Sequence, residues 1–180
     1  MPNQKTRLHR RTFLGAGVAA AAAGAALSCS RNGAGPYWRF FTAEEARTVD
    51  AICERLIPAD RDPGASQAGV VHYIDIQLTR VFRKHRNAYR QGIAAVDAAS
   101  RKTFGGRFAE LAPPQQAQVL EVLEHNSRAF FQLILTHAQQ GFYGDPRHGG
   151  NRRMASWKML GLPFPPVRGR QHYDEPPKEG

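Results

Sequence analysis

Apolar residues recur three and four positions apart through much of this 180-residue chain, and that spacing limits its fold more than any other feature. The repeat places apolar side chains along one face of an α-helix. No segment shows the apolar–polar alternation that predicts a half-buried β-strand. We therefore predict an all-α fold, a compact bundle of about five helices with a long glycine- and aromatic-rich carboxy-terminal loop and an extended tail.

Local signals place these helices within a predicted domain over residues 42–162. Thr42 and Glu45 form a capping box at the start of the first helix, which Pro58 ends. The second helix is expected over 70–84, with Val81 and Phe82 facing inward together with its other apolar residues. The remaining helices are expected over 87–104, from Pro113-Pro114 onward, and over 127–140 with Gly141 as C-cap.

The segment 142–162 has neither a helix nor a strand period, yet it is rich in glycine and aromatic residues. Glycines permit unusual backbone angles, and aromatic side chains anchor a loop to a core or a partner. We interpret the segment as a preformed partner interface, with closure of the chain's own helical core as the alternative. The predicted interface residues are Phe142, Tyr143, Gly144, Asp145, Pro146, Arg147, Gly149, Gly150, Asn151, Trp157 and Lys158.

The amino terminus has the organisation of an export signal. Basic residues precede an alanine-rich apolar run, which is shorter than the ~20 residues that a membrane span needs. Arg10, Arg11, Phe13 and Leu14 resemble a twin-arginine signal, and Cys29 is a candidate for lipidation. We therefore expect an export signal over 1–29, a tether over 30–41 and a proline-rich tail over 163–180, with the protein periplasmic and membrane-associated.

The charge balance favours contact with an acidic partner. The formal net charge is +10, and because the first 29 residues hold four basic residues and no acid, +6 remains without them. Export argues against a nucleic-acid partner, so an acidic protein or the anionic surface of a membrane is the expected contact. Solvated helix faces are the alternative explanation.

We expect no catalytic, cofactor-binding or metal site in this chain. Glu121 and His125 share a helix face, but the Glu-x-x-His pairs of di-metal bundles are absent from the sequence. Asp60 and Asp62 lie in a turn, where such residues bond their own backbone. Cys53 falls on an apolar helix face and is expected in the core. Nucleophile-elbow, dinucleotide-binding and haem-attachment motifs are likewise missing from the sequence.

Three segments together resemble the gluconate 2-dehydrogenase subunit 3 family. They are GFYGDPRHGGN with WKMLGLP in 141–163, RLIPADRDPGASQAGVVHYID over 55–75, and the twin-arginine signal. The resemblance implies a non-catalytic accessory subunit of an exported dehydrogenase acting on gluconate, a sugar or a polyol. It also implies FAD in a partner large subunit, haem c in a separate cytochrome c subunit, and passage through the twin-arginine translocation machinery. A free-standing periplasmic lipoprotein or ligand-binding domain is the main alternative, and a metal-dependent helical enzyme is a third.

Overall fold

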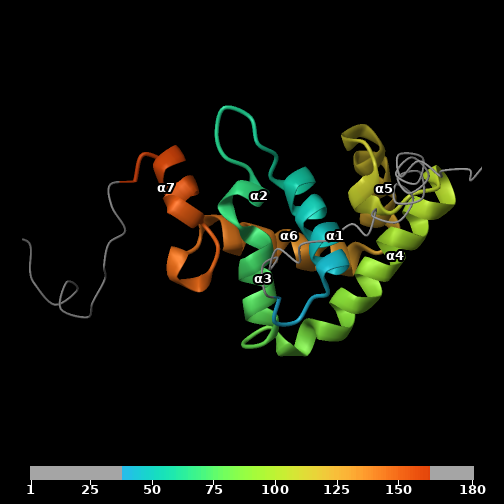
Figure 1. Ribbon diagram of the computed structural model, residues 1–180, viewed down its shortest axis with the longest axis horizontal. Coiled ribbons are helices and arrows are strands. Elements are labelled where there is room, and N and C mark those ends of the chain that lie inside the picture. The colour runs from blue at the N-terminus through green and yellow to red at the C-terminus, as the bar shows by residue number, and fades with distance from the viewer. Residues whose placement is uncertain (1–37, 163–180) are drawn as a thin grey trace, which may run out of the picture. The chain divides into compact units, whose positions relative to one another are not determined.

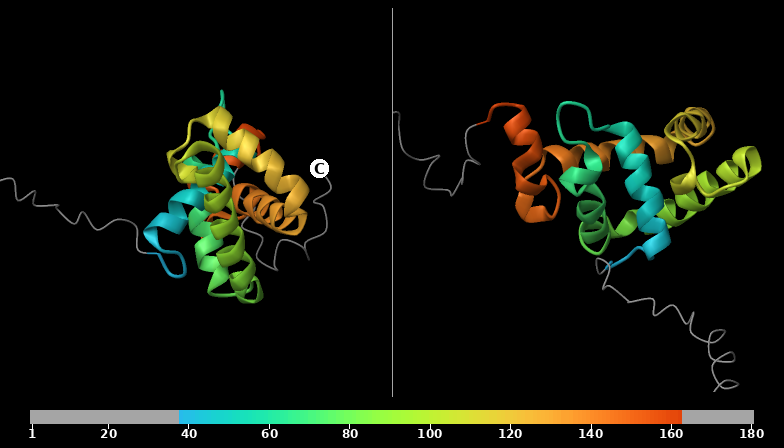
Figure 2. Two further views of the ribbon diagram at one scale, coloured as in Figure 1. Left: turned by 90° about the vertical axis from the view of Figure 1, so that its right-hand side faces the viewer. Right: turned by 45° about the horizontal axis from the view of Figure 1, so that its top comes forward.

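Helix α6 runs behind the other helices and connects the two ends of the domain (Figures 1 and 2). The computed structural model describes residues 38–162, and within them the fold is all-α, as predicted, with no β-strand. The helices are α1 (Ala43–Leu56), α2 (Ala65–Ala68), α3 (Val70–Leu78), α4 (Arg86–Phe104), α5 (Pro113–Asn126), α6 (Arg128–Tyr143) and α7 (Ala155–Met159), with short 3-10 turns η1 (Arg83–His85), η2 (Phe108–Glu110), η3 (Pro146–His148) and η4 (Arg152–Met154).

Three predicted helix boundaries are confirmed. The Thr42 hydroxyl accepts a hydrogen bond from the Glu45 amide at 3.2 Å, and the Glu45 carboxylate accepts one from the Thr42 amide at 2.8 Å. The capping box thus satisfies two amides that have no partner within α1. Gly105 ends α4 with a left-handed φ of 77°, and prolines occupy the first turn of α5. These boundaries follow from residues within a few positions of each other.

The second helix ends earlier than expected. Helix α3 stops at Leu78, and Val81, predicted to face inward, is 72% exposed. The amide of Phe82 donates to the carbonyl of Gln77 in a turn, and the Phe82 ring stacks on His137 with ring centres 3.7 Å apart. The chain leaves the helix because this turn packs the half-buried Phe82 ring against α6. The prediction that α3 reaches residue 84 is wrong.

Gly141 does not cap the last long helix. Helix α6 continues through Gly141 to Tyr143, and Gly144 occupies the C-cap with an extended backbone. Gly141 is buried at a crowded contact, where an added Cβ would lie 2.9 Å from Cδ1 of Tyr73. The glycine is thus explained by close packing against α3 rather than by helix termination.

Residues 38–41, expected to end the tether, pack against the domain instead. Asp75 of α3 is 2% exposed, and its carboxylate accepts hydrogen bonds from the amides of Arg39 (2.7 Å), Phe40 (2.9 Å) and Phe41 (3.0 Å). Phe41 lies in the hydrophobic core at 5% exposure. The packed domain therefore includes the segment before the Thr42 cap.

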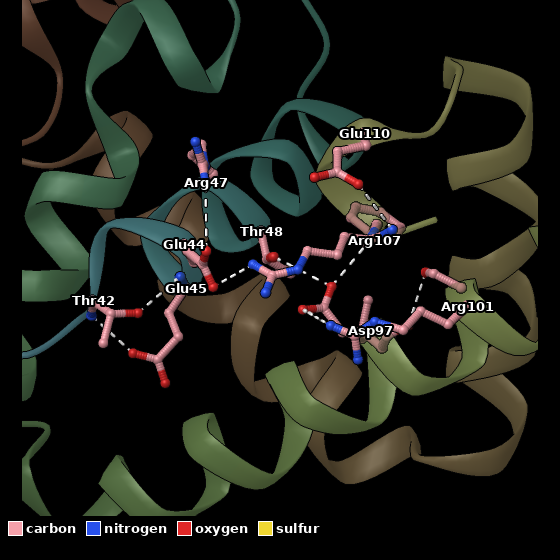
Figure 3. Close-up of polar contacts among 12 residues, drawn as sticks. Thr42, Glu44, Glu45, Arg47, Thr48, Asp97, Arg101, Arg107 and Glu110 are labelled. Atoms are coloured by element: carbon pink, nitrogen blue, oxygen red, sulfur yellow. Dashed lines mark hydrogen bonds and ion pairs between the residues drawn. The ribbon is translucent and has the colours of Figure 1, made fainter. Parts of the chain in front are cut away.

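A polar network joins α1, α4 and η2 (Figure 3). Arg107 forms an ion pair with Glu44, whose pKa it holds below the usual range through a side-chain hydrogen bond. Asp97 of α4 accepts hydrogen bonds from the Phe108 amide at 3.2 Å and the Thr48 hydroxyl at 3.4 Å. The network holds the η2 turn against both helices.

None of the helices over residues 38–162 has the length and apolar character needed to cross a membrane.

Candidate functional site

The carboxy-terminal segment is more regular than its sequence suggests. After α6, the chain forms the short turns η3 and η4 and then helix α7. The expectation of a segment without helix is therefore wrong at its end, because Trp157 and Lys158 lie on α7. The Trp157 indole N–H donates to the Tyr143 carbonyl at 2.9 Å and ties α7 to the end of α6.

Asp145 organises the first turn of the segment. Its carboxylate accepts hydrogen bonds from the Arg147 amide at 2.9 Å and from the Arg147 guanidinium at 2.7 and 2.9 Å. These hydrogen bonds from Arg147 hold the pKa of Asp145 below its usual range. The charge of Arg147 is therefore balanced within its own turn, which Gly149 ends at a φ of 101°.

Asn151 holds the rest of the segment from inside. It is fully buried, and its backbone amide donates to the Gly141 carbonyl at 2.9 Å. Its side-chain Nδ2 donates to the Gly144 carbonyl at 2.9 Å, and its Oδ1 accepts from the Ser156 backbone amide at 3.0 Å. Asn151, Arg153 and Met154 have φ values of 43°, 55° and 57°, which non-glycine residues rarely adopt. Such strain persists only where the surroundings enforce it, and Asn151 supplies that enforcement.

The predicted interface residues divide by burial. Phe142, at 1% exposure, and Gly150 and Asn151 are buried, so they support the segment from within and cannot touch a partner without rearrangement. Tyr143, Arg147 and Lys158 are exposed. The half-buried members are Gly144, Asp145, Pro146, Gly149 and Trp157. The assignment of this segment to a partner interface stays a prediction, with the exposed side chains as its contact residues.

A cleft that sequence reasoning did not anticipate lies beside α7. It has a volume of about 760 Å³ and is lined by Asp62, Pro63, Gln67, Arg152, Arg153, Ala155, Lys158 and Met159. Helix α2 with the turn before it supplies one wall, and η4 with α7 supplies the other. Because these two walls lie far apart in the sequence, no local pattern could have predicted that they line one cleft, although the pair Arg152 and Arg153 is visible in the sequence.

The contacts of the other candidate residues are those of turns, helices and the core. Asp60 accepts a hydrogen bond from the Asp62 amide at 2.9 Å, which is the turn interaction expected for it. His125 places Nδ1 2.8 Å from the backbone carbonyl of Glu121. Cys53 is buried in the core, as expected, and burial raises the pKa of its thiol. Across residues 38–162, no three histidine, cysteine or acidic side chains are grouped as metal ligands.

The remaining predicted sites lie outside the described residues. They are the export-signal residues Arg10, Arg11, Phe13 and Leu14, the lipidation candidate Cys29, and the tail 163–180.

The described geometry is that of an all-helical domain whose carboxy-terminal segment is held rigidly at its surface, a form suited to binding through a preformed face. The family model for gluconate 2-dehydrogenase subunit 3 matches residues 43–163, from α1 through α7. The chain therefore belongs to the gluconate 2-dehydrogenase subunit 3 family, and with it to the subunits of multi-subunit dehydrogenases. Neither a curated protein nor a solved structure matches the chain.

Proposed function

We propose that this chain is the non-catalytic accessory subunit of an exported dehydrogenase that oxidises gluconate, a related sugar acid, a sugar or a polyol. In this proposal a large subunit holds FAD and performs the oxidation, and a cytochrome c subunit with haem c accepts the electrons. The family match over 43–163 is the observation that carries the proposal. The rigid segment after α6 supports it, because a preformed surface loses little conformational entropy when a partner binds.

We further propose that the chain escorts its partner during export. A flavin-bearing subunit must fold around its cofactor before it crosses the membrane, and the twin-arginine route carries folded proteins. A partner without a signal of its own would cross bound to this chain, whose signal contains Arg10 and Arg11. After export, the same contact would stabilise the complex at the periplasmic face of the membrane.

Purification from native membranes tests the accessory role. A carboxy-terminally tagged chain is isolated, its partners are identified by mass spectrometry, and the flavin absorption spectrum is recorded. We expect a yellow complex with a large subunit in near-equal amount. A colourless monomer in high yield would contradict the proposal and favour a free-standing lipoprotein or ligand-binding domain.

A double substitution in the signal tests the escort role. Arg10→Lys with Arg11→Lys keeps the positive charge but removes both guanidinium groups. We expect both subunits to accumulate in the cytoplasm of this variant, as measured by fractionation. Arg7→Lys, an equivalent change in the same basic region, is the matched control and should leave export unchanged. Normal export of the large subunit in the double variant would refute the escort role.

A further inference from the structure

The cleft beside α7 carries a concentration of positive charge. Arg152, Arg153 and Lys158 contribute to its lining, and Asp62 is the single acid among the lining residues. All three basic side chains are exposed, and within residues 38–162 none of them forms an ion pair. Arg147 nearby differs, because its charge is balanced by Asp145. The walls of the cleft therefore present cationic groups that form no ion pair within residues 38–162, although the charge of Arg152 also acts on the nearby Asp50, where burial raises the pKa and this charge offsets part of the rise.

The fold restrains the two arginines of the cleft at their backbone. Arg153 lies in the left-handed region between Asn151 and Met154, and the buried side chain of Asn151 enforces that conformation. Arg152 lies against Gly69 at the junction of α2 and α3, where an added Cβ would come within 2.5 Å of its side chain. A side chain at Gly69 would displace Arg152. The backbone at residues 152–153 is thus fixed before any partner arrives, which lowers the entropic cost of binding.

The lining of the cleft also contains groups suited to a polypeptide. Gln67 offers an amide that can bond backbone groups, and Pro63 and Met159 offer apolar surface. The walls come from two separate regions, α2 with its preceding turn and η4 with α7, which lie side by side in Figure 1. A hollow with mixed lining fits an inserted peptide better than the flat surface of a membrane.

We propose that this cleft binds an acidic segment of the flavin-bearing large subunit, with Arg152, Arg153 and Lys158 receiving its carboxylates. The inference rests on the proposed function and adds the chemistry of the contact. Arginine and lysine favour carboxylate partners, and a fixed cationic cleft both attracts an acidic segment and selects its orientation. Tyr143 and Arg147 then form a separate part of the same partner-binding surface.

Charge reversal tests the cleft in the purified complex. The double variant Arg153→Glu with Lys158→Glu is compared with wild type for its rate of association with the large subunit. We expect association at low salt to slow about tenfold or more, because the steering charge is inverted. Arg153→Gln with Lys158→Gln should give an intermediate loss and a weaker dependence on salt. Thermal unfolding of each variant, unchanged from wild type, shows that the fold is retained.

Lys84→Glu with Lys102→Glu is the matched control. It makes the same charge change at exposed positions in η1 and near the end of α4, and α7 lies at the opposite end of the domain from that end of α4 (Figure 1). Its association rate should stay within about threefold of wild type. Zero-length carbodiimide coupling gives a second readout, since it joins Lys158 to a carboxylate in direct contact. We expect a cross-link from Lys158 to an aspartate or glutamate of the large subunit.

Several outcomes would overturn the assignment. If wild type binds the large subunit and the reversed variant binds equally fast, the cleft is not the contact, while the proposed function stands. If wild type does not bind a flavin-bearing subunit, the proposed function itself fails. If the reversed variant keeps its partner but loses binding to phosphatidylglycerol vesicles, the cleft is a lipid site instead.

Discussion

At the scale of single residues, Asp75 decides where the chain enters the domain. A buried carboxylate is costly unless donors fill its lone pairs, and here three consecutive backbone amides do so. Removing the Asp75 carboxylate would cost much stability, because the backbone amides of residues 39–41 would be left without an acceptor. The carboxylate therefore fastens the segment before α1 to α3.

Replacing Asp75 with asparagine tests this interaction. Asparagine keeps the shape but has one acceptor oxygen and no charge, so the free energy of unfolding should fall by about 2–4 kcal/mol. Urea denaturation measures the change, and limited proteolysis near residue 39 reports local release. Glu124→Gln, the same chemical change at an exposed site on α5, should stay within about 0.5 kcal/mol of wild type. An unchanged urea midpoint for Asp75→Asn would show that the clamp contributes nothing.

His137 is a second residue whose surroundings are set by packing. It is 4% exposed on α6, stacks on Phe82 and lies 3.0 Å from the Tyr89 hydroxyl through Nδ1. Burial, and to a lesser degree the neighbouring His85, lower the pKa of His137 to about 4. The native state therefore keeps this imidazole neutral well below pH 6.

This shift predicts loss of stability in mild acid. Well above pH 6.5 the His137 imidazole is neutral in both the native and the unfolded state. As the pH falls below about 6.5, the unfolded chain binds a proton at this imidazole, whereas the native state does not. The free energy of unfolding should therefore fall by about 2 kcal/mol between pH 7.5 and pH 5 from this residue alone. Urea denaturation at both pH values is compared between wild type and His137→Gln, whose acid-dependent loss should be smaller by that amount. His125→Gln, a change at an exposed histidine, should lose as much unfolding free energy between the two pH values as wild type does. An equal loss in all three proteins would disprove the role of His137.

At the scale of elements, the contact between α6 and the segment after it depends on Gly150. The backbone of Gly150 passes directly over the carbonyl of Gly141, which accepts the Asn151 amide at 2.9 Å. A Cβ at Gly150 would fall on that carbonyl oxygen, and a backbone group cannot move aside as a flexible side chain can. The close approach lets Asn151 reach the interior.

Gly150→Ala should therefore destabilise the protein by about 1–3 kcal/mol, the usual cost of overpacking. Urea denaturation measures the global effect, and hydrogen exchange over 141–162 shows whether the segment opens locally. Gly106→Ala is the control, because its Cβ would meet its nearest neighbour, Leu111, at an ordinary 3.4 Å. The explanation by close approach fails if the two alanine variants unfold at the same urea concentration.

At the scale of the whole molecule, membership of a multi-subunit family predicts that stability depends on the partner. A partner that binds the native state alone stabilises it by mass action, by about 2.7 kcal/mol at one hundred times the dissociation constant. The unfolding temperature of this chain should rise with the concentration of added large subunit, as followed by differential scanning calorimetry. Serum albumin at equal concentration serves as the control. A constant unfolding temperature over that range would argue against a stable complex.

Much of the fold could be predicted because its signals are local. The capping box of Thr42 and Glu45, the prolines that open α5 and the glycine that ends α4 all act within about one helical turn. The bonds of the Asp145 turn are just as local, since they join residues two positions apart. Helix α3 could not be delimited in this way, because Phe82 leaves the helical pattern to stack on a residue of α6.

The candidate site shows the same division between local and distant causes. By itself the sequence determined an all-α fold, most helix positions and the unusual character of 141–162, since periodicity and turn chemistry depend on neighbouring residues. Only the tertiary structure decided that Gly141 lies inside a helix, that Phe142 and Asn151 face inward, and that Arg152, Arg153 and Lys158 share a cleft with Asp62 and Gln67. The physical reason is that burial and charge proximity depend on segments far apart in the chain, which meet only when the helices pack.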